Sequence, residues 1–522
     1  MPAVLVELYR SGVKGLVWWW MYNLYSEQYN TITVGGEQGP RYRVLGLREG
    51  SPCSPRLFMI MINRVFEIMR GKGISVGQNL DIWVGLLGFA DDLSGHADSD
   101  DEVQDMLDML DEFAEEYLLQ FTGPKCGVTA SLENAAVQRQ ARTYKFRCAG
   151  GVTEIHEKPK AKQLGLWHGA DRSPKVHASS RSQVAPAASA VLAAAGAGTF
   201  GAGGAAEKHL VGAIWDSTVY FATEQYPAEI ANGDKGAYKK IMQAAAAGGQ
   251  ALHGGARGPA VAAEMVTGMG NPLHAMEYRS AKEIGRKLAR PAHTLTHRLQ
   301  REEAAGHVYG EQHRAATAAI AQRAGLGCHY RDGTSPGCAS TRNRVVREHL
   351  GPLHGEEQRT RMRALPSLAF QMEVHAWMEG HEIPLPEHRD YADNGYPAWR
   401  IIMAGGDRLR EFPRSAARAA QDRACQNAGC MGVTETKAHL LGSCRKERIA
   451  EIRRQFAAEQ RIGTYGGAFT HQQVVRIMAN DSADWGATLD REGTEAAVQR
   501  YVGQVWRERF GQDNGSQLLG RQ

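Results

Sequence analysis

The sequence predicts an α+β protein in which a mixed segment of helices and strands precedes a long helical region. Short apolar runs that end in turn residues support the first part, and apolar residues at steps of three and four support the second. A third observation is a short Cys/His segment at 425–444. The 522 residues are 43% hydrophobic and 23% charged, which is enough apolar material to build folded cores.

The overall charge is nearly balanced. Sixty-one Lys and Arg against 57 Asp and Glu give a net charge of +4, so a phosphate-binding surface has to come from local patches. Eight cysteines are too few for a disulfide scaffold, no signal peptide is evident, and the apolar run 15–25 is shorter than a bilayer span. We therefore expect an intracellular protein without a membrane segment, in which clustered Cys and His bind metal.

Periodicity and turn residues place the elements of the first part. Ser54 is the expected cap of one helix, with Pro55 in its first turn. The acidic side of another helix, at 100–119, is read as a solvated face. The expected elements are a helix within 3–26, strands at 31–34 and 41–45, a helix at 54–69, a buried strand at 82–90 and the amphipathic helix at 100–119.

The rest of the chain divides by composition. The Ala- and Gly-rich stretch 181–206 is a helix with a flexible end or a linker. The segments that follow are a helical region at 207–300, a further helical region of unknown role at 301–420, the Cys/His segment at 421–446, and a helical tail with a polar end at 447–522.

Two adjacent acids lie where chemistry is expected. In GFADDLS (88–94) an apolar run enters Asp91 and Asp92 and a second short apolar stretch leaves them, which predicts a β-hairpin with the carboxylates at its tip. Adjacent carboxylates repel each other, and Mg²⁺ or Mn²⁺ is a suitable counter-ion. A pair of such metals can clamp the attacking and leaving oxygens of a phosphoryl transfer. The alternative is an Asx turn between two strands.

The segments around this pair extend the pattern. They are GLREGSPCSPRLF (46–58) upstream, FTGPKC (121–126) downstream and KQLGL (162–166) further on. In this order and spacing they resemble consecutive motifs of the reverse transcriptase palm of non-LTR (LINE-type) retrotransposons. Weaker likeness at 12–18, 210–224 and 264–273 extends the resemblance to residues 1–300.

The resemblance implies a partial polymerase palm at 1–180, including a primer-grip-like hairpin, and a thumb-like region at 207–300. It implies that Asp91 binds the metal that joins the primer 3′-hydroxyl to the nucleotide phosphates, and that Asp92 binds it less directly or holds the turn. Lys125 would neutralise or protonate the departing pyrophosphate. The remaining implied contacts are Gly50, Ser51, Pro52 and Phe89 with template and nucleotide, and Leu164 and Gly165 with the primer.

The implied partners are an RNA template, a DNA primer or target, and deoxynucleoside triphosphates. A nuclear location follows by analogy with a family that primes on chromosomal DNA.

One expected ligand has no counterpart in the chain. The family places a further aspartate on a strand before the helix that starts near Val4, whereas the first aspartate here is Asp81. The earlier acid Glu7 lies in a predicted helix and is a poor substitute. We therefore expect a truncated element or an incomplete gene model without appreciable polymerase activity. The alternatives are a non-catalytic nucleic-acid-binding protein and a decayed copy.

The Cys/His segment has the spacing Cys425-x4-Cys430-x8-His439-x4-Cys444. Four such ligands in a short loop predict a tetrahedral Zn²⁺ site. ETKAHLL (435–441) resembles the zinc-knuckle-like motif near the C-terminus of non-LTR reverse transcriptases. Unpaired structural cysteines are the alternative, and the other five cysteines are read as incidental.

A basic stretch follows the thumb-like segment. A solvated helix face and a phosphate-contacting surface are both open interpretations. Its residues are Arg279, Lys282, Arg286, Lys287, Arg290, Arg298 and Arg301.

Overall fold

The protein forms two compact units in the computed structural model, Met1–Val176 with Arg290–Gly310 and His177–Ala289 with Glu311–Gln522. The residues described are 3–44, 46–47, 50–130, 142–148, 151–171, 173–195, 209–232, 236–252, 271–364, four positions within 373–378, 425, 430, 436, 438–464, 467–483, 485–487 and 491–510.

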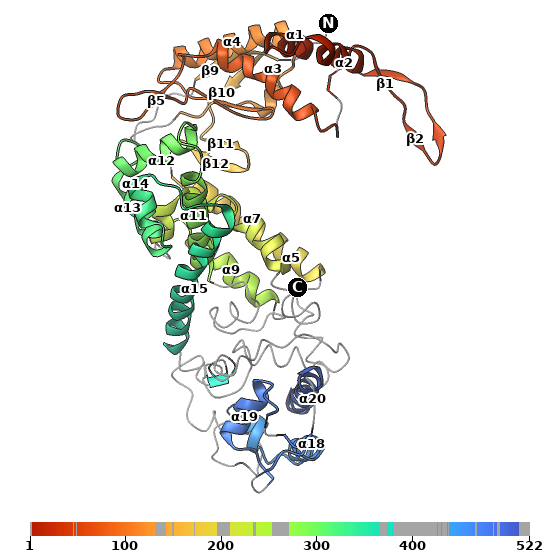
Figure 1. Ribbon diagram of the computed structural model, residues 1–522. Coiled ribbons are helices and arrows are strands. Elements are labelled where there is room, and N and C mark those ends of the chain that lie inside the picture. Colours follow the sequence, from red (N-terminus) through yellow and green to blue (C-terminus); the bar gives the residue numbers. More distant parts are fainter. Residues whose placement is uncertain are drawn as a thin grey trace. The chain divides into compact units, whose positions relative to one another are not determined.

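Two short helices open the first unit (Figure 1). They are α1 (Ala3–Arg10) and α2 (Gly15–Tyr25), where one helix was expected. Gly12 separates them with a φ of +93°, a left-handed conformation that ends a helix and that glycine adopts without steric cost. Val4 and Leu8 of α1 are buried with Met21 and Tyr25 of α2.

The strands described form six separate two-stranded antiparallel ribbons instead of one continuous sheet. They are β1 (Gln28–Asn30) with β4 (Tyr42–Val44), β2 (Thr33–Val34) with β3 (Glu37–Gln38), β5 (Ser75–Val76) with β6 (Ile82–Trp83), β7 (Leu86–Phe89) with β8 (Asp92–Gly95), β9 (Thr143–Cys148) with β10 (Gly151–His156), and β11 (Lys160–Gln163) with β12 (Leu166–Gly169).

The expected buried strand 82–90 is divided into β6 and β7. Gly85 lies between them, and a Cβ there would come within 2.2 Å of the Lys72 carbonyl oxygen. The Trp83 indole donates a hydrogen bond to the same oxygen at 2.6 Å. The backbone is therefore held against the segment after α3 at this point, and the strand is interrupted.

Helices α3 (Ser54–Ile68) and α4 (Asp100–Tyr117) carry the core of this unit. The N-cap of α3 is Cys53, without a side-chain capping bond, so Ser54 is the first helical residue and not the cap that the sequence predicted. The Oγ of Ser99 does cap α4, because it accepts a hydrogen bond from Glu102 N at 3.2 Å. The buried side chains of this core are Met61, Ile62, Val65, Met69, Leu86, Met106, Phe113 and Tyr117.

The segment 290–310 belongs to this first unit. It contains α12 (Leu295–Ala305), which lies against β6. Arg298 pairs with Asp81 at 2.5 Å, and a carboxylate oxygen of Glu302 accepts a hydrogen bond from Gln78 N at 2.8 Å. These contacts fasten α12 to the β5–β6 ribbon.

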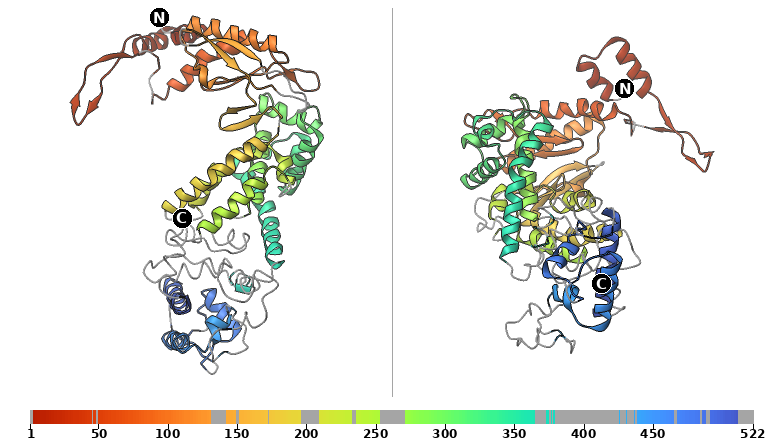
Figure 2. Two further views of the ribbon diagram at one scale, coloured as in Figure 1. Left: turned by 180° about the vertical axis from the view of Figure 1, so that it is seen from behind. Right: turned by 60° about the horizontal axis from the view of Figure 1, so that its bottom comes forward.

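The second unit is helical over its described residues up to 364 (Figure 2). Of the Ala- and Gly-rich stretch 181–206, residues 181–194 belong to the helix α5 (Lys175–Ala194), and 196–206 lie outside the described residues. The side chains of Trp215, Tyr220 and Tyr238 are fully buried here. The further elements are η2 (Val211–Asp216), α7 (Ser217–Val219), η3 (Thr223–Gln225), α8 (Pro227–Asn232), α9 (Lys239–Leu252), α11 (Pro272–Leu288), α13 (Glu311–Arg323), α14 (Gly327–Asp332) and α15 (Ala339–Arg363).

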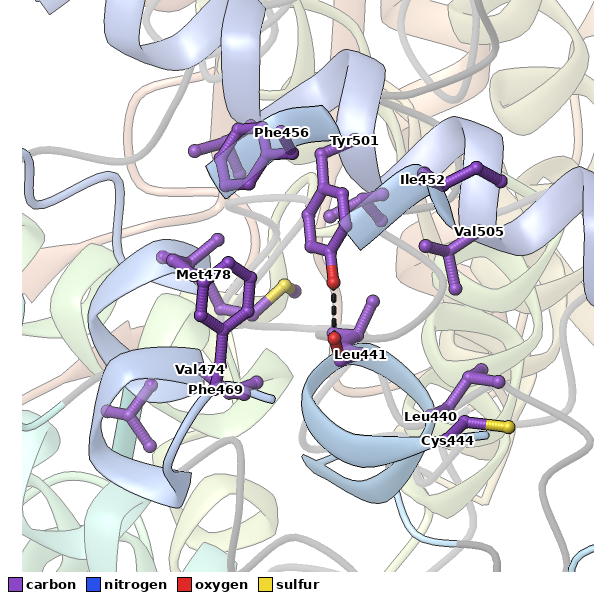
Figure 3. Close-up of a cluster of buried hydrophobic side chains, with 14 of the residues drawn as sticks. Leu440, Leu441, Cys444, Ile452, Phe456, Phe469, Val474, Met478, Tyr501 and Val505 are labelled. Atoms are coloured by element: carbon purple, nitrogen blue, oxygen red, sulfur yellow. Dashed lines mark hydrogen bonds between the residues drawn. The ribbon is translucent and has the colours of Figure 1, made fainter. Parts of the chain in front are cut away.

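A separate hydrophobic core holds the C-terminal part of this unit (Figure 3). Its elements are η8 (His439–Ser443), α18 (Glu447–Glu459), α19 (His471–Met478) and α20 (Arg491–Phe510). Phe456 stacks on Tyr501, whose hydroxyl donates a hydrogen bond to the Leu441 carbonyl. The expected polar end, 511–522, and nearly all of 365–424 lie outside the described residues. None of the described helices combines the length and apolarity needed to cross a membrane.

Candidate functional site

The two aspartates lie at the tip of the β7–β8 hairpin, as the sequence predicted. Phe89 pairs with Asp92, so Ala90 and Asp91 form a two-residue loop. Ala90 has a φ of +53°, which is rare for a residue with a Cβ and costs about 1 kcal/mol. Asp91 and Asp92 are both exposed, so their carboxylates are accessible to ligands.

A glycine lets this hairpin lie close to α3. A Cβ on Gly88 would come within 2.8 Å of the Phe66 ring and 3.0 Å of Leu93. Leu86 is 3% exposed in the core between α3 and α4, whereas Phe89 is 65% exposed. The base of the hairpin is therefore anchored while its tip, with Phe89 and the two aspartates, faces solvent.

The segment 50–52 forms the turn that leads into α3. Gly50 adopts a φ of +76°, and no atom would meet a Cβ built on it. The Ser51 carbonyl accepts a hydrogen bond from Ser54 N at 3.1 Å, and its Oγ accepts one from Cys53 N at 3.4 Å. Pro52 is exposed. Hydrogen bonds within 51–54 therefore hold the turn, and the space beside the Gly50 Cα is open.

Lys125 lies in the short helix η1 (Gly123–Lys125), which contacts β10. Its side chain is exposed. In the part of the chain that the structure describes, no hydrogen bond or ion pair joins Lys125 to Asp91 or Asp92.

Leu164 and Gly165 form the loop between β11 and β12. Their φ values of +48° and +84° fit a type I′ turn, in which both central residues are left-handed. Burial lowers the pKa of His96, at the end of β8, and repulsion from His168 of β12 lowers it further. The β7–β8 and β11–β12 hairpins therefore lie close enough for His96 and His168 to interact electrostatically.

The carboxylate pair has no third partner among the residues described. In that part of the chain, no third His, Cys, Asp or Glu lies close enough to Asp91 and Asp92 to form a three-ligand metal site. Glu7 is on α1, as expected, and is 5% exposed. It accepts hydrogen bonds from Tyr117 Oη at 2.5 Å and Arg10 Nη1 at 2.6 Å. Burial, with this hydrogen bond next, raises the pKa of Tyr117 to about 12. The Glu7 carboxylate is thus held by hydrogen bonds within the fold, from Tyr117 of α4 and Arg10 of α1.

The comparison with protein families covers this unit. Residues 5–167 match the family model of reverse transcriptase (RNA-dependent DNA polymerase). The matched range begins within α1 and ends within β12, and it includes the β7–β8 hairpin and the loop between β11 and β12. A search of curated proteins gives no match. The match supports the resemblance to reverse transcriptases that the sequence predicted for this region.

A second candidate site joins the predicted metal ligands. Cys425, Cys430, His439 and Cys444 are all buried, and their ligand atoms lie within 4.8 Å of one another. The Sγ atoms of Cys425 and Cys444 are 3.9 Å apart. Two sulfurs at about 2.3 Å from a tetrahedral zinc ion would be separated by about 3.8 Å. The donor set and its size therefore fit Zn²⁺.

Local backbone geometry brings two of these ligands together. In the π-helix η8, Cys444 N donates a hydrogen bond to His439 O at 2.7 Å, a five-residue step that brings the two residues close. His439 Nδ1 is 3.1 Å from Ser443 Oγ. If Nδ1 carries the proton, Nε2 is the nitrogen left to bind metal. Arg445 N donates a hydrogen bond to Cys430 Sγ at 3.0 Å.

Burial, together with repulsion from Cys425 and Cys430, raises the pKa of the Cys444 thiol to about 12. Without a cation in the site, the Cys444 thiol is therefore protonated near neutral pH. Bound metal would supply the positive charge that stabilises the thiolates.

A buried arginine beside the site supports the same interpretation. Arg453 is 3% exposed, and its guanidinium donates to Cys444 O at 3.1 Å and Gly467 O at 3.0 Å. Its Nη1 has no hydrogen-bond partner among the residues described. Burial lowers the pKa of Arg453, while nearby Tyr501 and Cys444 oppose this. A zinc ion with three thiolates carries a net charge of −1, which would compensate this guanidinium.

Sequence reasoning missed Arg453, Ser443 and the left-handed Ala90. Nothing in the local pattern separates buried Arg453 from its exposed neighbour Arg454. The burial of Arg453 follows from how α18 packs, which periodicity alone does not specify. An alanine two residues after a glycine in a predicted hairpin loop was the available signal for strain at Ala90.

The predicted basic stretch is not a continuous charged face. Arg279 points inward, with its guanidinium 3.4 Å from Glu224 and 3.3 Å from Asp216 O. Arg298 is bound to Asp81, and Arg286 pairs with Glu283. At least three of these arginines therefore form ion pairs with acids of the protein itself.

Proposed function

We propose that the first unit is the polymerase region of a non-LTR retrotransposon reverse transcriptase, with Asp91 and Asp92 as divalent-metal ligands. The observation that carries the proposal is the hairpin tip, where two exposed carboxylates follow a left-handed Ala90 inside the range that matches the reverse transcriptase family. Non-glycine residues in this conformation cluster at functional sites. Partial palm and thumb-like regions at 1–180 and 207–300 belong to the same proposal.

Each proposed site residue has a physical role that its position allows. Mg²⁺ or Mn²⁺, when bound, would draw the nucleotide phosphates and the primer hydroxyl together. Asp91 would hold the metal directly, and Asp92 would assist. The exposed Lys125 would offset charge on the departing pyrophosphate. The open backbone at Gly50, with Ser51 and Pro52, and the exposed ring of Phe89 would line the path of template, primer and nucleotide.

The proposal also assigns Leu164 and Gly165 to the primer grip. Their type I′ loop places two backbone units at the end of a ribbon, where they can approach a primer strand closely. The substrates would be an RNA template, a DNA primer or target and deoxynucleoside triphosphates. Because such elements prime on chromosomal DNA, the proposed location is the nucleus.

Nucleotide binding tests this function directly. We expect the full chain, mixed with an RNA template annealed to a DNA primer, to bind the next complementary deoxynucleoside triphosphate in the presence of Mn²⁺. A variant with Asp91→Asn and Asp92→Asn should lose at least tenfold in affinity for the nucleotide, because its metal bridge to the phosphates is removed.

A matched control removes two acids elsewhere in the unit. Glu112 and Glu116 are exposed on α4, so Glu112→Gln with Glu116→Gln changes the net charge equally while leaving the hairpin intact. Nucleotide affinity should stay at the wild-type level in this control. Equal affinities in the wild-type chain and the Asp91/Asp92 variant would sink the proposal.

We further propose that this chain alone does not polymerise. The metal clamp of phosphoryl transfer needs several oxygen ligands, and the hairpin provides two carboxylates without a third among the residues described. A chain of this kind would bind template, primer and nucleotide as a nucleic-acid-binding remnant of the enzyme. This non-catalytic function involves the same template, primer and nucleotide as polymerisation, but no nucleotide is added to the primer.

We propose that Cys425, Cys430, His439 and Cys444 hold a structural Zn²⁺ ion in a zinc-knuckle-like segment. Metal analysis of the purified chain should give one zinc per chain, and Co²⁺ exchange should give the absorption bands of a tetrahedral thiolate site. Cys430→Ser should abolish both signals. Cys328→Ser is the matched control, because Cys328 is exposed and belongs to no metal-ligand cluster among the residues described. Unchanged zinc content in Cys430→Ser would contradict the assignment.

A further inference from the structure

The ribbon that follows α2 carries aromatic and cationic side chains together on one face. Tyr29 of β1 lies directly opposite Arg43 of β4, and directly opposed residues project to the same side of a ribbon. Arg41 precedes Arg43 by two residues, which returns it to that side. Its guanidinium carbon lies 4.5 Å from the centroid of the Tyr29 ring. We call Tyr29, Arg41 and Arg43 the ribbon face.

The ribbon face is open to solvent. Tyr29 is 42% exposed, and Arg41 and Arg43 are both exposed. Neither arginine forms an ion pair with an acid in the described part of the chain. The one acid within the ribbon, Glu37, lies in β3 opposite Val34, beyond the β1–β4 pairing. Figure 1 shows the ribbon extending away from α2, clear of the other elements of its own unit.

The chemistry of this face selects an occupant. A tyrosine ring and a guanidinium plane both stack on nucleobases, and arginines pair with phosphates. A duplex keeps its bases stacked inside, so an exposed aromatic platform of this kind suits a single strand. An acidic protein would be attracted by the arginines, but its carboxylates would offer no flat ring to stack on Tyr29 and Arg41.

We propose that the ribbon face binds single-stranded RNA, with a base stacked on Tyr29 and Arg41 and a phosphate held by Arg43. The inference rests on the proposed function for the choice of RNA, since a template strand is the single strand that such an enzyme holds. It adds a contact outside the two hairpins and the segment 50–52, and this contact does not require divalent metal.

Binding of an unstructured, fluorescently labelled RNA of about 20 nucleotides to the full chain tests the proposal. Fluorescence anisotropy is measured over a series of monovalent salt concentrations with a chelator present. Tyr29→Ala should weaken binding by about tenfold, whereas Tyr29→Phe, which keeps the ring, should bind as the wild type does. Arg43→Gln should reduce the slope of log Kd against log salt by about 0.7, the value for one lost phosphate contact to a single strand.

A matched arginine serves as the control. Arg147 is similarly exposed, in β9, and faces Glu115 at 3.7 Å. Arg147→Gln should leave both affinity and salt slope unchanged. Far-ultraviolet circular dichroism and the thermal midpoint of Tyr29→Ala should match those of Tyr29→Phe, which separates lost binding from lost folding.

Three results would overturn the inference. If the wild-type chain binds RNA and Tyr29→Ala and Arg43→Gln bind equally well, the ribbon face is not the contact, and the proposed function stands. If Tyr29→Ala changes self-association and not RNA affinity, the face is an interface between copies. If the wild-type chain binds no RNA without metal, the inference fails, and the Mn²⁺-dependent nucleotide experiment decides separately on the proposed function.

Discussion

Arg453 donates a hydrogen bond from Nη2 to the carbonyl oxygen of Cys444 at 3.1 Å, so a buried cation lies beside the last ligand of the Cys/His cluster. This relationship gives the candidate zinc site an electrostatic requirement. A guanidinium that is 3% exposed needs compensating negative charge, and a zinc ion with three thiolates provides one unit of it. The metal and the arginine should therefore stabilise each other.

We expect Arg453→Met to destabilise the zinc-loaded C-terminal core by about 3 kcal/mol, because it leaves the charged site without its partner. Arg454→Met is the matched control, since Arg454 is the adjacent, exposed arginine, and should change stability by less than about 0.5 kcal/mol. Hydrogen exchange of peptides from α18 to α20, with zinc and after chelation, measures the difference. A loss of equal size in the chelated chain would show that Arg453 acts only through its carbonyl hydrogen bonds.

The second unit should lose stability in mild acid. His274 stacks on His354 with ring centroids 4.1 Å apart, and their Nε2 atoms lie 2.8 Å from Glu357 and 2.7 Å from Glu277 respectively. Burial, with repulsion from His354 next, lowers the pKa of His274 to about 4. The folded state then binds fewer protons than the unfolded state between about pH 6.5 and pH 4, so stability falls as pH falls through this window.

The glutamate beside the stack acts in the same direction. Hydrogen bonds from His354 and Arg323 lower the pKa of Glu277 in spite of its burial. A carboxylate of this kind stabilises the fold above its unfolded pKa, and that contribution is lost as pH falls through the folded pKa.

The thermal midpoint of His274→Gln should decline less between pH 6.5 and 4 than that of the wild type, because glutamine keeps a donor for Glu357 and does not titrate. His349→Gln, which removes an exposed histidine of α15, should follow the wild-type curve. Parallel curves for the wild type and His274→Gln would rule out this source of acid sensitivity.

Replacing Ala90 should strengthen the hairpin while leaving its acids in place. Glycine adopts a φ of +53° without the steric cost that alanine bears, so Ala90→Gly should stabilise β7–β8 by about 0.5–1 kcal/mol. Ala97 packs against the same core and does not have a left-handed backbone conformation. Ala97→Gly should therefore destabilise the hairpin. Exchange rates of the amides in 86–95 report the change. Faster exchange in Ala90→Gly would mean that the left-handed alanine is not strained.

Local patterns were sufficient for much of the first unit. The period of apolar residues located α3 and α4 within two residues of their ends, and the apolar runs around Asp91 and Asp92 located the β7–β8 hairpin. The Cys/His spacing identified four side chains that the fold does bring together. These predictions succeeded because each depends on residues that are near in sequence or on a donor set with few alternatives.

Tertiary contacts account for the rest. The break between β6 and β7 depends on the approach of Gly85 to Lys72, and the association of α12 with the β5–β6 ribbon depends on Arg298 and Asp81, which are far apart in sequence. Within the basic stretch, Arg279 turns toward Glu224, which lies 55 residues earlier in the sequence. None of these contacts leaves a periodic signal in the chain.

Primer extension on an RNA template tests the central claim most directly. The assay uses the 522-residue chain with Mg²⁺ or Mn²⁺, beside a variant with Asp91→Asn and Asp92→Asn. Because the hairpin offers two carboxylates without a third among the described residues, we expect nucleotide binding but no extension above the level of the variant. Extension by the wild-type chain that disappears in the variant would contradict this account, since another group would then complete the metal site.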